Sequence, residues 1–102
     1  MSKEQMRESL SNLYRAVTLI ESPEEAEAFL TDLCTIKELQ DMAQRLVAAE
    51  MLEKGENYLS IASGIGISTA TISRVSKALN YGSGGYELIL GRLRETAESP
   101  EE

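Results

Sequence analysis

The spacing of apolar residues predicts an amphipathic first helix over about residues 3–21. Its apolar positions recur at intervals of three and four residues, which places them along one side of a helix. They are Met6, Leu10, Leu13, Val17 and Ile20. A single helix cannot bury such a stripe on itself, so the stripe must pack against another part of the chain or against a second copy.

A second helix is predicted to begin at Pro23. Ser22 can act as its N-cap, proline suits the first helical position, and Glu25 can complete a capping box on the Ser22 amide. The helix should end near Leu33 and bury one side. The residues expected on that side are Ala26, Phe29, Leu30 and Leu33.

The same start signal recurs at Thr35, with Glu38 as its capping-box partner. A third helix of about nineteen residues should follow and end at Gly55, which is free to adopt a positive φ. The inward positions expected for this helix are Leu39, Met42, Leu46, Ala49 and Leu52.

Glycines and a proline divide the C-terminal part. The turn over residues 80–85 contains three glycines and should interrupt the helix before it. A last helix is predicted over about residues 86–94, and an acidic tail containing Pro100 over residues 96–102. The β-branched stretches elsewhere are too short for strands. The predicted fold is therefore all-α, with six helices in a single domain over residues 1–102.

The central segment, residues 58–79, has the pattern of a helix-turn-helix. Ala62 is small enough to lie where two helices cross steeply, and Gly66 can form the turn with a positive φ. Ser68 can cap the second helix. Apolar residues stand where the angle between the helices must be filled, namely Ile61, Ile65, Ile67, Ile72 and Val75.

The outward positions of the second helix suit contact with DNA. Small hydroxyl and methyl groups can approach base edges, and the cations that follow can reach phosphates. The candidate DNA-binding residues are Ser68, Thr69, Ala70, Ser73, Arg74 and Lys77. The alternative is a helical corner that serves packing alone, but the joint fit of the small, glycine and apolar positions favours DNA binding.

The charge of the chain opposes strong DNA binding, because its net charge is −7. The charge is unevenly distributed. Residues 56–82 carry two basic side chains and one acidic one, a net charge of +1, whereas the three segments around them are each net negative. DNA contact by the central segment is therefore possible but electrostatically weak.

Other functional classes find little support in the composition. The chain has no histidine, and its single Cys34 lies in an apolar register that favours an inert, buried thiol. No metal site, cofactor or catalytic constellation is indicated, so we do not expect an enzyme. No apolar run is long enough to span a membrane and no signal-peptide core follows the N-terminus, so a cytoplasmic protein is expected.

The run Gly-Ile-Ser-Thr-Ala-Thr-Ile-Ser-Arg-Val-Ser-Lys-Ala-Leu over residues 66–79 resembles the DNA-reading segment of the Trp repressor-like family. The Tyr-Gly-Ser-Gly-Gly-Tyr loop over residues 81–86 is similar to the loop of the YerC/YecD subgroup of this family in particular. The resemblance covers about residues 10–95. It implies a six-helix, intertwined homodimer that places its two reading heads in successive major grooves of double-stranded DNA.

The family's tryptophan site is matched only in part. The resemblance implies that Thr35, Arg45, Thr71 and Arg74 could hold an effector. Val75, however, replaces a glycine that leaves room for the indole ring, and Ala78 replaces a hydroxyl that helps to hold the amino group. A branched side chain in a close-packed slot excludes a ligand from it. We therefore predict that L-tryptophan is not a corepressor of this protein.

Two further features make the match to the family's DNA-binding and effector-binding residues less complete. Leu59 and Ala62 stand where the family's repressor carries basic residues, which implies weaker contact with phosphates. Arg45 and Arg74 could also be simple surface ion-pair partners of carboxylates such as Glu38 or Glu50.

Two functions remain open. The first is a homodimeric, sequence-specific transcription regulator, most simply a repressor that blocks its site and binds a palindrome with half-sites about one helical turn apart. The second is a protein-interaction scaffold that keeps the helix-turn-helix fold but has lost strong DNA binding. The net negative charge supports the second function.

Overall fold

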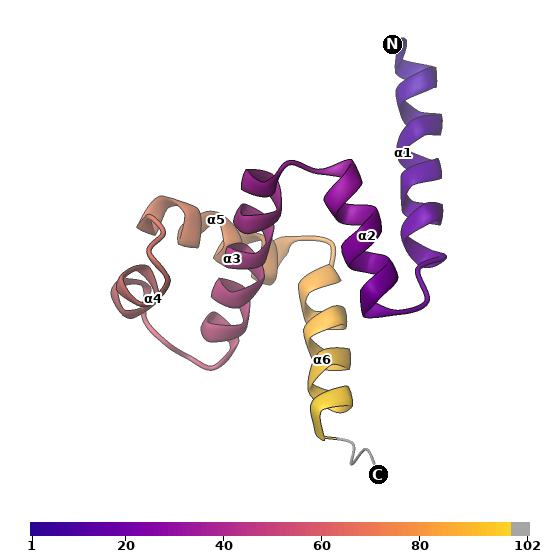
Figure 1. Cartoon of the computed structure of the whole chain (residues 1–102). Coiled ribbons are helices and arrows are strands. Elements are labelled where there is room, and N and C mark those ends of the chain that lie inside the picture. Colours follow the sequence, from indigo (N-terminus) through magenta and orange to yellow (C-terminus); the bar gives the residue numbers. More distant parts are fainter. Residues whose placement is uncertain (99–102) are drawn as a thin grey trace. The chain divides into compact units, whose positions relative to one another are not determined.

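The computed structural model describes residues 1–98, and all regular secondary structure in this part of the chain is helical (Figure 1). The helices are α1 (Lys3–Thr18), α2 (Pro23–Leu33), α3 (Ile36–Glu53), α4 (Tyr58–Ile65), α5 (Thr69–Tyr81) and α6 (Gly85–Glu98). The prediction of an all-α, six-helix fold is confirmed. Residues 99–102 of the predicted acidic tail lie outside the described residues.

The chain divides into two compact units, residues 1–39 and the chain from Gln40 onward. In the first unit, α1 ends at the turn that leads into α2, and side chains of both helices line a shallow hollow. Its lining residues are Ala16, Leu19, Ile20, Glu25 and Phe29. No residue of α1 or α2 is fully buried.

The predicted helix starts are present, but one differs in detail. The Ser22 hydroxyl accepts a hydrogen bond from the Glu25 amide at 3.1 Å, as expected for an N-cap. The Glu25 carboxylate accepts from the amide of Glu21 at 3.0 Å, not from that of Ser22, so the predicted capping box is wrong in its second bond. At Thr35 both bonds form with Glu38, at 3.0 and 2.8 Å, and that prediction is confirmed.

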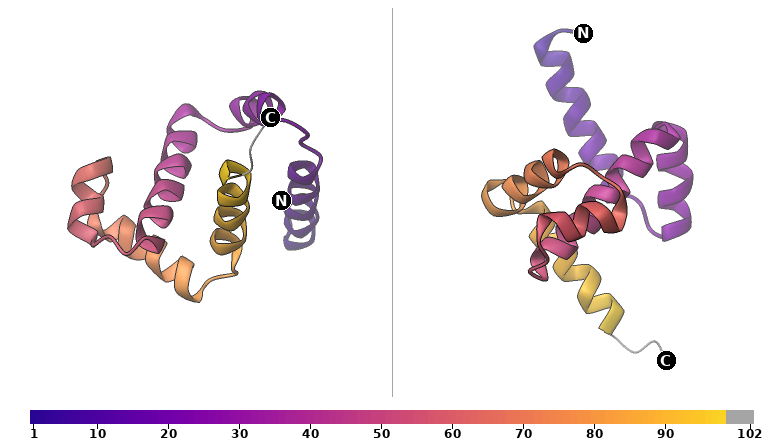
Figure 2. Two further views of the ribbon diagram at one scale, coloured as in Figure 1. Left: turned by 90° about the horizontal axis from the view of Figure 1, so that it is seen from below. Right: turned by 90° about the vertical axis from the view of Figure 1, so that its left-hand side faces the viewer.

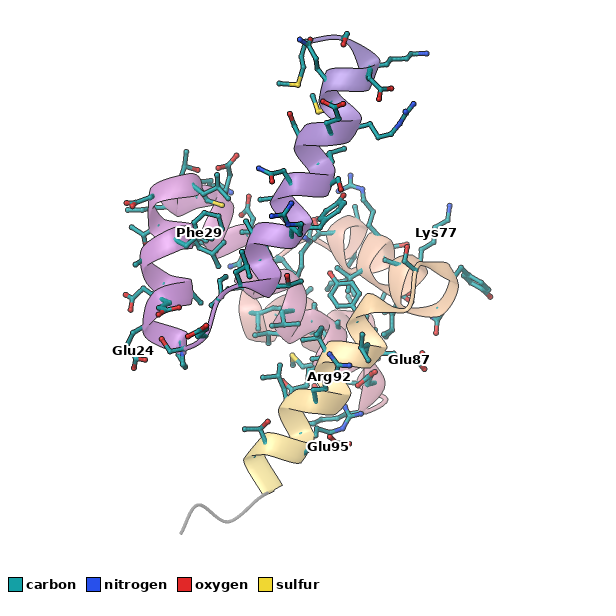
Figure 3. The ribbon with its side chains drawn as sticks, turned by 90° about the vertical axis from the view of Figure 1, so that its right-hand side faces the viewer. Glu24, Phe29, Lys77, Glu87, Arg92 and Glu95 are labelled. Atoms are coloured by element: carbon teal, nitrogen blue, oxygen red, sulfur yellow. The ribbon has the colours of Figure 1, made fainter. Side chains whose placement is uncertain are left out.

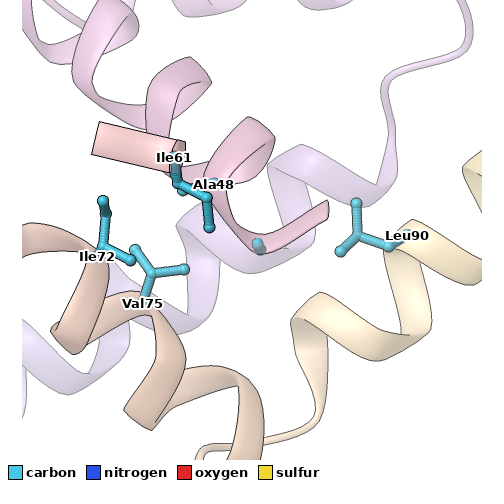
Figure 4. Close-up of a cluster of buried hydrophobic side chains, with 6 residues drawn as sticks. Ala48, Ile61, Ile72, Val75 and Leu90 are labelled. Carbon is cyan, nitrogen blue, oxygen red and sulfur yellow. The ribbon is translucent and has the colours of Figure 1, made fainter. Parts of the chain in front are cut away.

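The core of the second unit is a small cluster of aliphatic side chains from four helices (Figure 4). Its buried members are Ala48, Ala49, Ile61, Ile72, Val75 and Leu90. The two alanines are the members from α3, and both are completely buried in the same cluster as the side chains from α4 and α5. Half-buried side chains, including those of Leu46, Met51 and Tyr86, surround this cluster.

The last helix is longer at both ends than predicted. It begins at Gly85 and ends at Glu98, so residues 96–98 of the predicted tail are helical. Of the three turn glycines, Gly82 and Gly84 are the ones whose backbone requires glycine. A Cβ atom on Gly82 would lie 2.3 Å from the Ala78 carbonyl oxygen, and Gly84 has φ +85°. Gly85 meets neither constraint, and it starts the helix.

The first helix is shorter than predicted and ends at Thr18 instead of near residue 21. The Thr18 hydroxyl donates to the carbonyl of Arg15 at 2.7 Å. The next two amides bond to carbonyls three residues back, Leu19 to Ala16 and Ile20 to Val17. This tighter final turn closes the helix, as is common at helix ends.

An ion pair joins two helices of the second unit that are distant in sequence. The Arg94 guanidinium donates to the Glu53 carboxylate at 2.7 Å, and the Glu53 side chain is only 18% exposed. The pair therefore ties the end of α3, just before the Gly55 turn, to α6. The views in Figure 2 show α3 and α6 from two further directions.

Candidate nucleic-acid interface

The first helix of the motif, α4, is fixed at its start by a side-chain cap. The side-chain Oδ1 of Asn57 accepts a hydrogen bond from the Ser60 amide at 2.8 Å, which satisfies one of the free amides of the first turn. On the inner side of α4, Ile61 is fully buried and Ala62 half-buried. The short helix is thus held by a cap at one end and by the core along its length.

Gly66 forms the turn as predicted. Its φ is +74° and its amide donates to the Ala62 carbonyl at 2.8 Å, so α4 ends in a left-handed residue. A residue with a side chain rarely adopts this conformation. Ile65 and Ile67 flank the glycine and are half-buried against the core. The turn is therefore determined by backbone conformation and by packing on both sides of it.

Ser68 caps the second helix, which confirms its structural prediction. Its hydroxyl oxygen accepts from the Thr71 amide at 3.1 Å and lies 3.0 Å from the Thr71 hydroxyl. Ile72 and Val75 then turn into the core. Because these contacts fix the inward side of α5, the opposite side of the helix must face solvent.

The remaining candidate DNA-binding residues all lie on that exposed side. They are Thr69, Ala70, Ser73, Arg74 and Lys77. Figure 3 shows the Lys77 side chain extending away from the body of the unit. From Thr69 to Tyr81 the helix carries two cations and no carboxylate. The structure thus places on one surface the residues that the sequence predicts to contact DNA.

The ion pairs do not support a purely structural role for the two arginines. Among the described residues, neither Arg45 nor Arg74 forms an ion pair, and both are exposed. The carboxylates considered as their partners have other contacts. Glu38 bonds to Thr35, and Glu50 lies 3.9 Å from the Lys54 ammonium.

The candidate effector residues are distributed over both units. Thr35 belongs to the first unit, where its hydroxyl caps α3. In the second unit, Arg45 and Arg74 are exposed, Thr71 is half-buried beside Ser68, and Val75 is only 2% exposed. Val75 therefore fills the core position where the family's repressor would leave space beside a glycine.

The first helix of the motif shows an apolar residue on its surface. Leu59 is 76% exposed, although it is fully aliphatic and stands where the family's repressor has a basic residue. Ala62, the other such position, is half-buried and packs against the core. A basic side chain could therefore be accommodated at residue 59 but not at residue 62 without disturbing the core.

Several supporting contacts were not predicted from the sequence. The cap at Asn57 follows the usual preference for asparagine before a helix and could have been recognised from its position ahead of Tyr58. The burial of Ala48 beside Ala49 and the Glu53–Arg94 pair depend on how helices cross, for which a single sequence carries no signal. Cys34 is half-buried, less than its register suggested.

Comparison with known proteins agrees with this geometry. The family model described as Trp repressor protein matches residues 8–94, which is most of the chain and includes the whole helix-turn-helix. The chain belongs to the Trp repressor family. The match includes all of the residues assigned above to the candidate interface.

Relatives of this Trp repressor family member share a large part of its length. It is 47% identical over 87 residues to the uncharacterized protein YerC of Bacillus subtilis (strain 168), covering 85% of this chain and 84% of YerC. This relative agrees with the subgroup indicated by the glycine-rich loop.

Two crystal structures have the same fold. A TrpR-like protein from Eubacterium eligens ATCC 27750 matches with a TM-score of 0.80 and 42% identity, covering 84% of this chain and 89% of that one. A protein from Staphylococcus aureus, provisionally assigned as a Trp repressor, matches with a TM-score of 0.81 and 41% identity, covering 92% and 95%.

The described residues show neither a membrane span nor a metal site. None of the helices there is both long and apolar enough to cross a membrane. Within residues 1–98 there is also no group of three or more cysteine or carboxylate side chains placed to hold a metal ion.

Proposed function

We propose that this protein is a sequence-specific DNA-binding transcription regulator that acts as a homodimer in the cytoplasm. The observation that carries the proposal is the outward surface of α5. It presents hydroxyl and methyl groups followed by two cations, Arg74 and Lys77, with no carboxylate on the helix and no ion pair to either cation among the described residues. These are the groups that a helix uses in the major groove.

The proposed mechanism is insertion of α5 into the major groove, with exclusion of other proteins from the site. The first turn of α5, from Thr69 to Ser73, lies near base edges, and Arg74 and Lys77 lie near phosphates. A two-fold symmetric dimer then reads a palindromic site whose half-sites are one helical turn apart, about 34–36 Å. A regulator that occludes a promoter in this way acts as a repressor.

The exposed apolar side chains support the dimer. On α1 part of the predicted stripe is uncovered, because Met6 and Val17 are each 47% exposed, whereas Leu13 is half-buried. On α6, Leu88 and Leu93 are about as exposed, and Ile89 lines an apolar hollow of about 500 Å³ that is open to solvent. Apolar surface on this scale in a short chain is typical of a surface that a partner covers.

DNA binding is tested by selecting bound fragments from genomic DNA with the purified protein. A single enriched palindrome is expected. Arg74→Ala should lower affinity for that site about tenfold and reduce its salt dependence, because one cation is lost from each half-site contact. Arg7→Ala is the matched control, since it removes an exposed cation that is paired with Glu4 on α1, and it should leave affinity nearly unchanged.

The same experiment separates the regulator from the interaction scaffold. A scaffold would enrich no fragment even at low salt, and Arg74→Ala would then change nothing. Either of these results would contradict the proposed function.

Dimerisation is tested by sedimentation velocity over a range of protein concentrations. The wild type should sediment as a dimer, and Leu10→Glu, which places a charge within the α1 stripe, should shift the equilibrium toward monomer. Ser11→Glu introduces the same charge on the polar side of α1 and should leave the dimer intact. A monomeric wild type at all concentrations would contradict the proposed dimer.

A further inference from the structure

We propose that Ala70 reads the methyl group of a thymine, so that each half-site of the operator contains an obligatory T·A base pair facing this residue. The inference rests on the proposed function, because it concerns the same surface of α5. It adds the class of DNA sequence that the surface selects and the residue that selects it.

The side chains of α5 offer few ways of discriminating between bases. Hydroxyl groups such as those of Thr69 and Ser73 can either donate or accept, so they fit several base edges equally well. The Thr71 hydroxyl is 3.0 Å from Ser68 and lies on the half-buried side. The one carboxamide, that of Asn80, lies in the last turn and donates to Ser76 at 3.3 Å.

Ala70 differs from these residues because its side chain contains no polar atom. It is exposed in the first turn of α5, the part of a recognition helix that usually approaches base edges. A methyl group placed against a polar base edge would desolvate that edge without replacing its hydrogen bond. Ala70 can therefore favour one base over another only through an apolar contact.

The major groove offers one apolar group, the C5 methyl of thymine. Cytosine, adenine and guanine present only hydrogen-bonding groups or an unsubstituted ring edge there. Arg74 lies one helical turn after Ala70 on the same side of α5 and is exposed, so it can anchor the backbone while Ala70 approaches the base. The complement of this surface is thus a half-site with a thymine methyl at the Ala70 position.

The test replaces thymine by deoxyuridine, position by position, in the palindrome selected by the wild type. This change removes only the methyl group and keeps base pairing. At one position in each half-site, affinity should fall about fourfold for one substitution and about fifteenfold for both, the value expected for one buried methyl per half-site.

Protein variants identify the residue responsible. Ala70→Ser keeps the size and the helix but places a hydroxyl against the methyl, so it should bind the thymine and deoxyuridine sites with nearly equal affinity. Lys77→Ala is the control, because it should weaken both sites by the same factor. Melting curves followed by circular dichroism confirm that each variant is folded.

The outcomes separate the two proposals. Enrichment of a palindrome that is insensitive to deoxyuridine at every position would overturn the thymine inference and leave DNA binding in place. So would a loss that is equal in the wild type and in Ala70→Ser. Failure to enrich any fragment would overturn the proposed function and this inference with it.

Discussion

Val75 packs with Ile61 and Ile72 at the point where the second helix of the motif meets α3, and almost none of its surface remains exposed. In the family's repressor a glycine at this position leaves room for an indole ring. The valine methyl groups occupy that volume here as part of the aliphatic core. We infer that this one difference replaces a ligand slot with packing that stabilises the unliganded motif.

We expect L-tryptophan not to bind, and isothermal titration should detect no heat of binding at millimolar ligand. Shortening the same side chain in Val75→Ala should lower the free energy of unfolding by about 2 kcal/mol, because it opens a cavity in the core. Chemical denaturation measures this loss. Tight tryptophan binding by the wild type would contradict the assignment of Val75 as a filled slot.

Leu59 is an aliphatic side chain that is 76% exposed on α4, and it offers no charge to a DNA phosphate. We expect Leu59→Lys to raise affinity for the selected operator several-fold and to steepen its salt dependence by about 1 unit of slope per protomer. Fluorescence anisotropy titrations at several salt concentrations measure both effects.

Ser11→Lys adds the same charge on the polar side of α1 and is the control for Leu59→Lys. Equal gains from the two variants would mean that net charge, not the position on α4, determines affinity.

Among the secondary-structure elements, α4 contains one glycine within the helix and ends at a second, and the two should respond in opposite ways to replacement by alanine. Gly66 has φ +74°, so Gly66→Ala should destabilise the protein by about 1–2 kcal/mol. Gly64 lies within α4, and a Cβ there would be 3.8 Å from the Met51 methyl group, an ordinary contact. Gly64→Ala should therefore stabilise the protein by about 0.5–1 kcal/mol.

Thermal or denaturant unfolding of the two variants tests this contrast. Because both add one methyl group and lie two residues apart, they share most other influences. A Gly66→Ala variant as stable as the wild type would show that the turn does not require a left-handed residue, and a destabilised Gly64→Ala would contradict the prediction for α4.

The secondary-structure elements also show which features could be predicted from the sequence alone. Local signals were sufficient for the caps at Ser22, Thr35 and Ser68 and for the turn at Gly66, because each depends on residues within one helical turn. The same reasoning gave the outward residues of α5, since the inward ones follow from periodicity.

The sequence left other contacts undecided, at short range as well as at long range. Glu25 could bond to either of two adjacent amides, and its spacing from Ser22 does not decide between them. The salt bridge from Glu53 to Arg94 joins residues 41 positions apart, and which carboxylate an arginine meets depends on helix packing. A sequence pattern likewise says that an apolar stripe needs a partner but not which surface provides it.

For the whole molecule, the distribution of charge determines how binding responds to salt. The chain has a net charge of −7, and α5 supplies only Arg74 and Lys77 as cations. Two protomers then make four phosphate contacts, so affinity should fall with a log–log slope of about −3.6, which is about a hundredfold between about 50 and about 200 mM salt.

Anisotropy titrations across that salt range measure the slope. A double variant lacking both cations, Arg74→Ala with Lys77→Ala, should bind with almost no salt dependence and provides the control. A much steeper wild-type slope would mean that cations outside α5 also contact the DNA.

The absence of any buried residue on α1 has a consequence for the lifetime of the protein. If a second copy covers this helix, folding is linked to protein concentration, because dilution removes the surface on which the helix is stable. Newly made chains below the association threshold would keep α1 accessible to proteases. Cellular turnover would then fall as the protein accumulates, so that its abundance would rise steeply with the rate of synthesis.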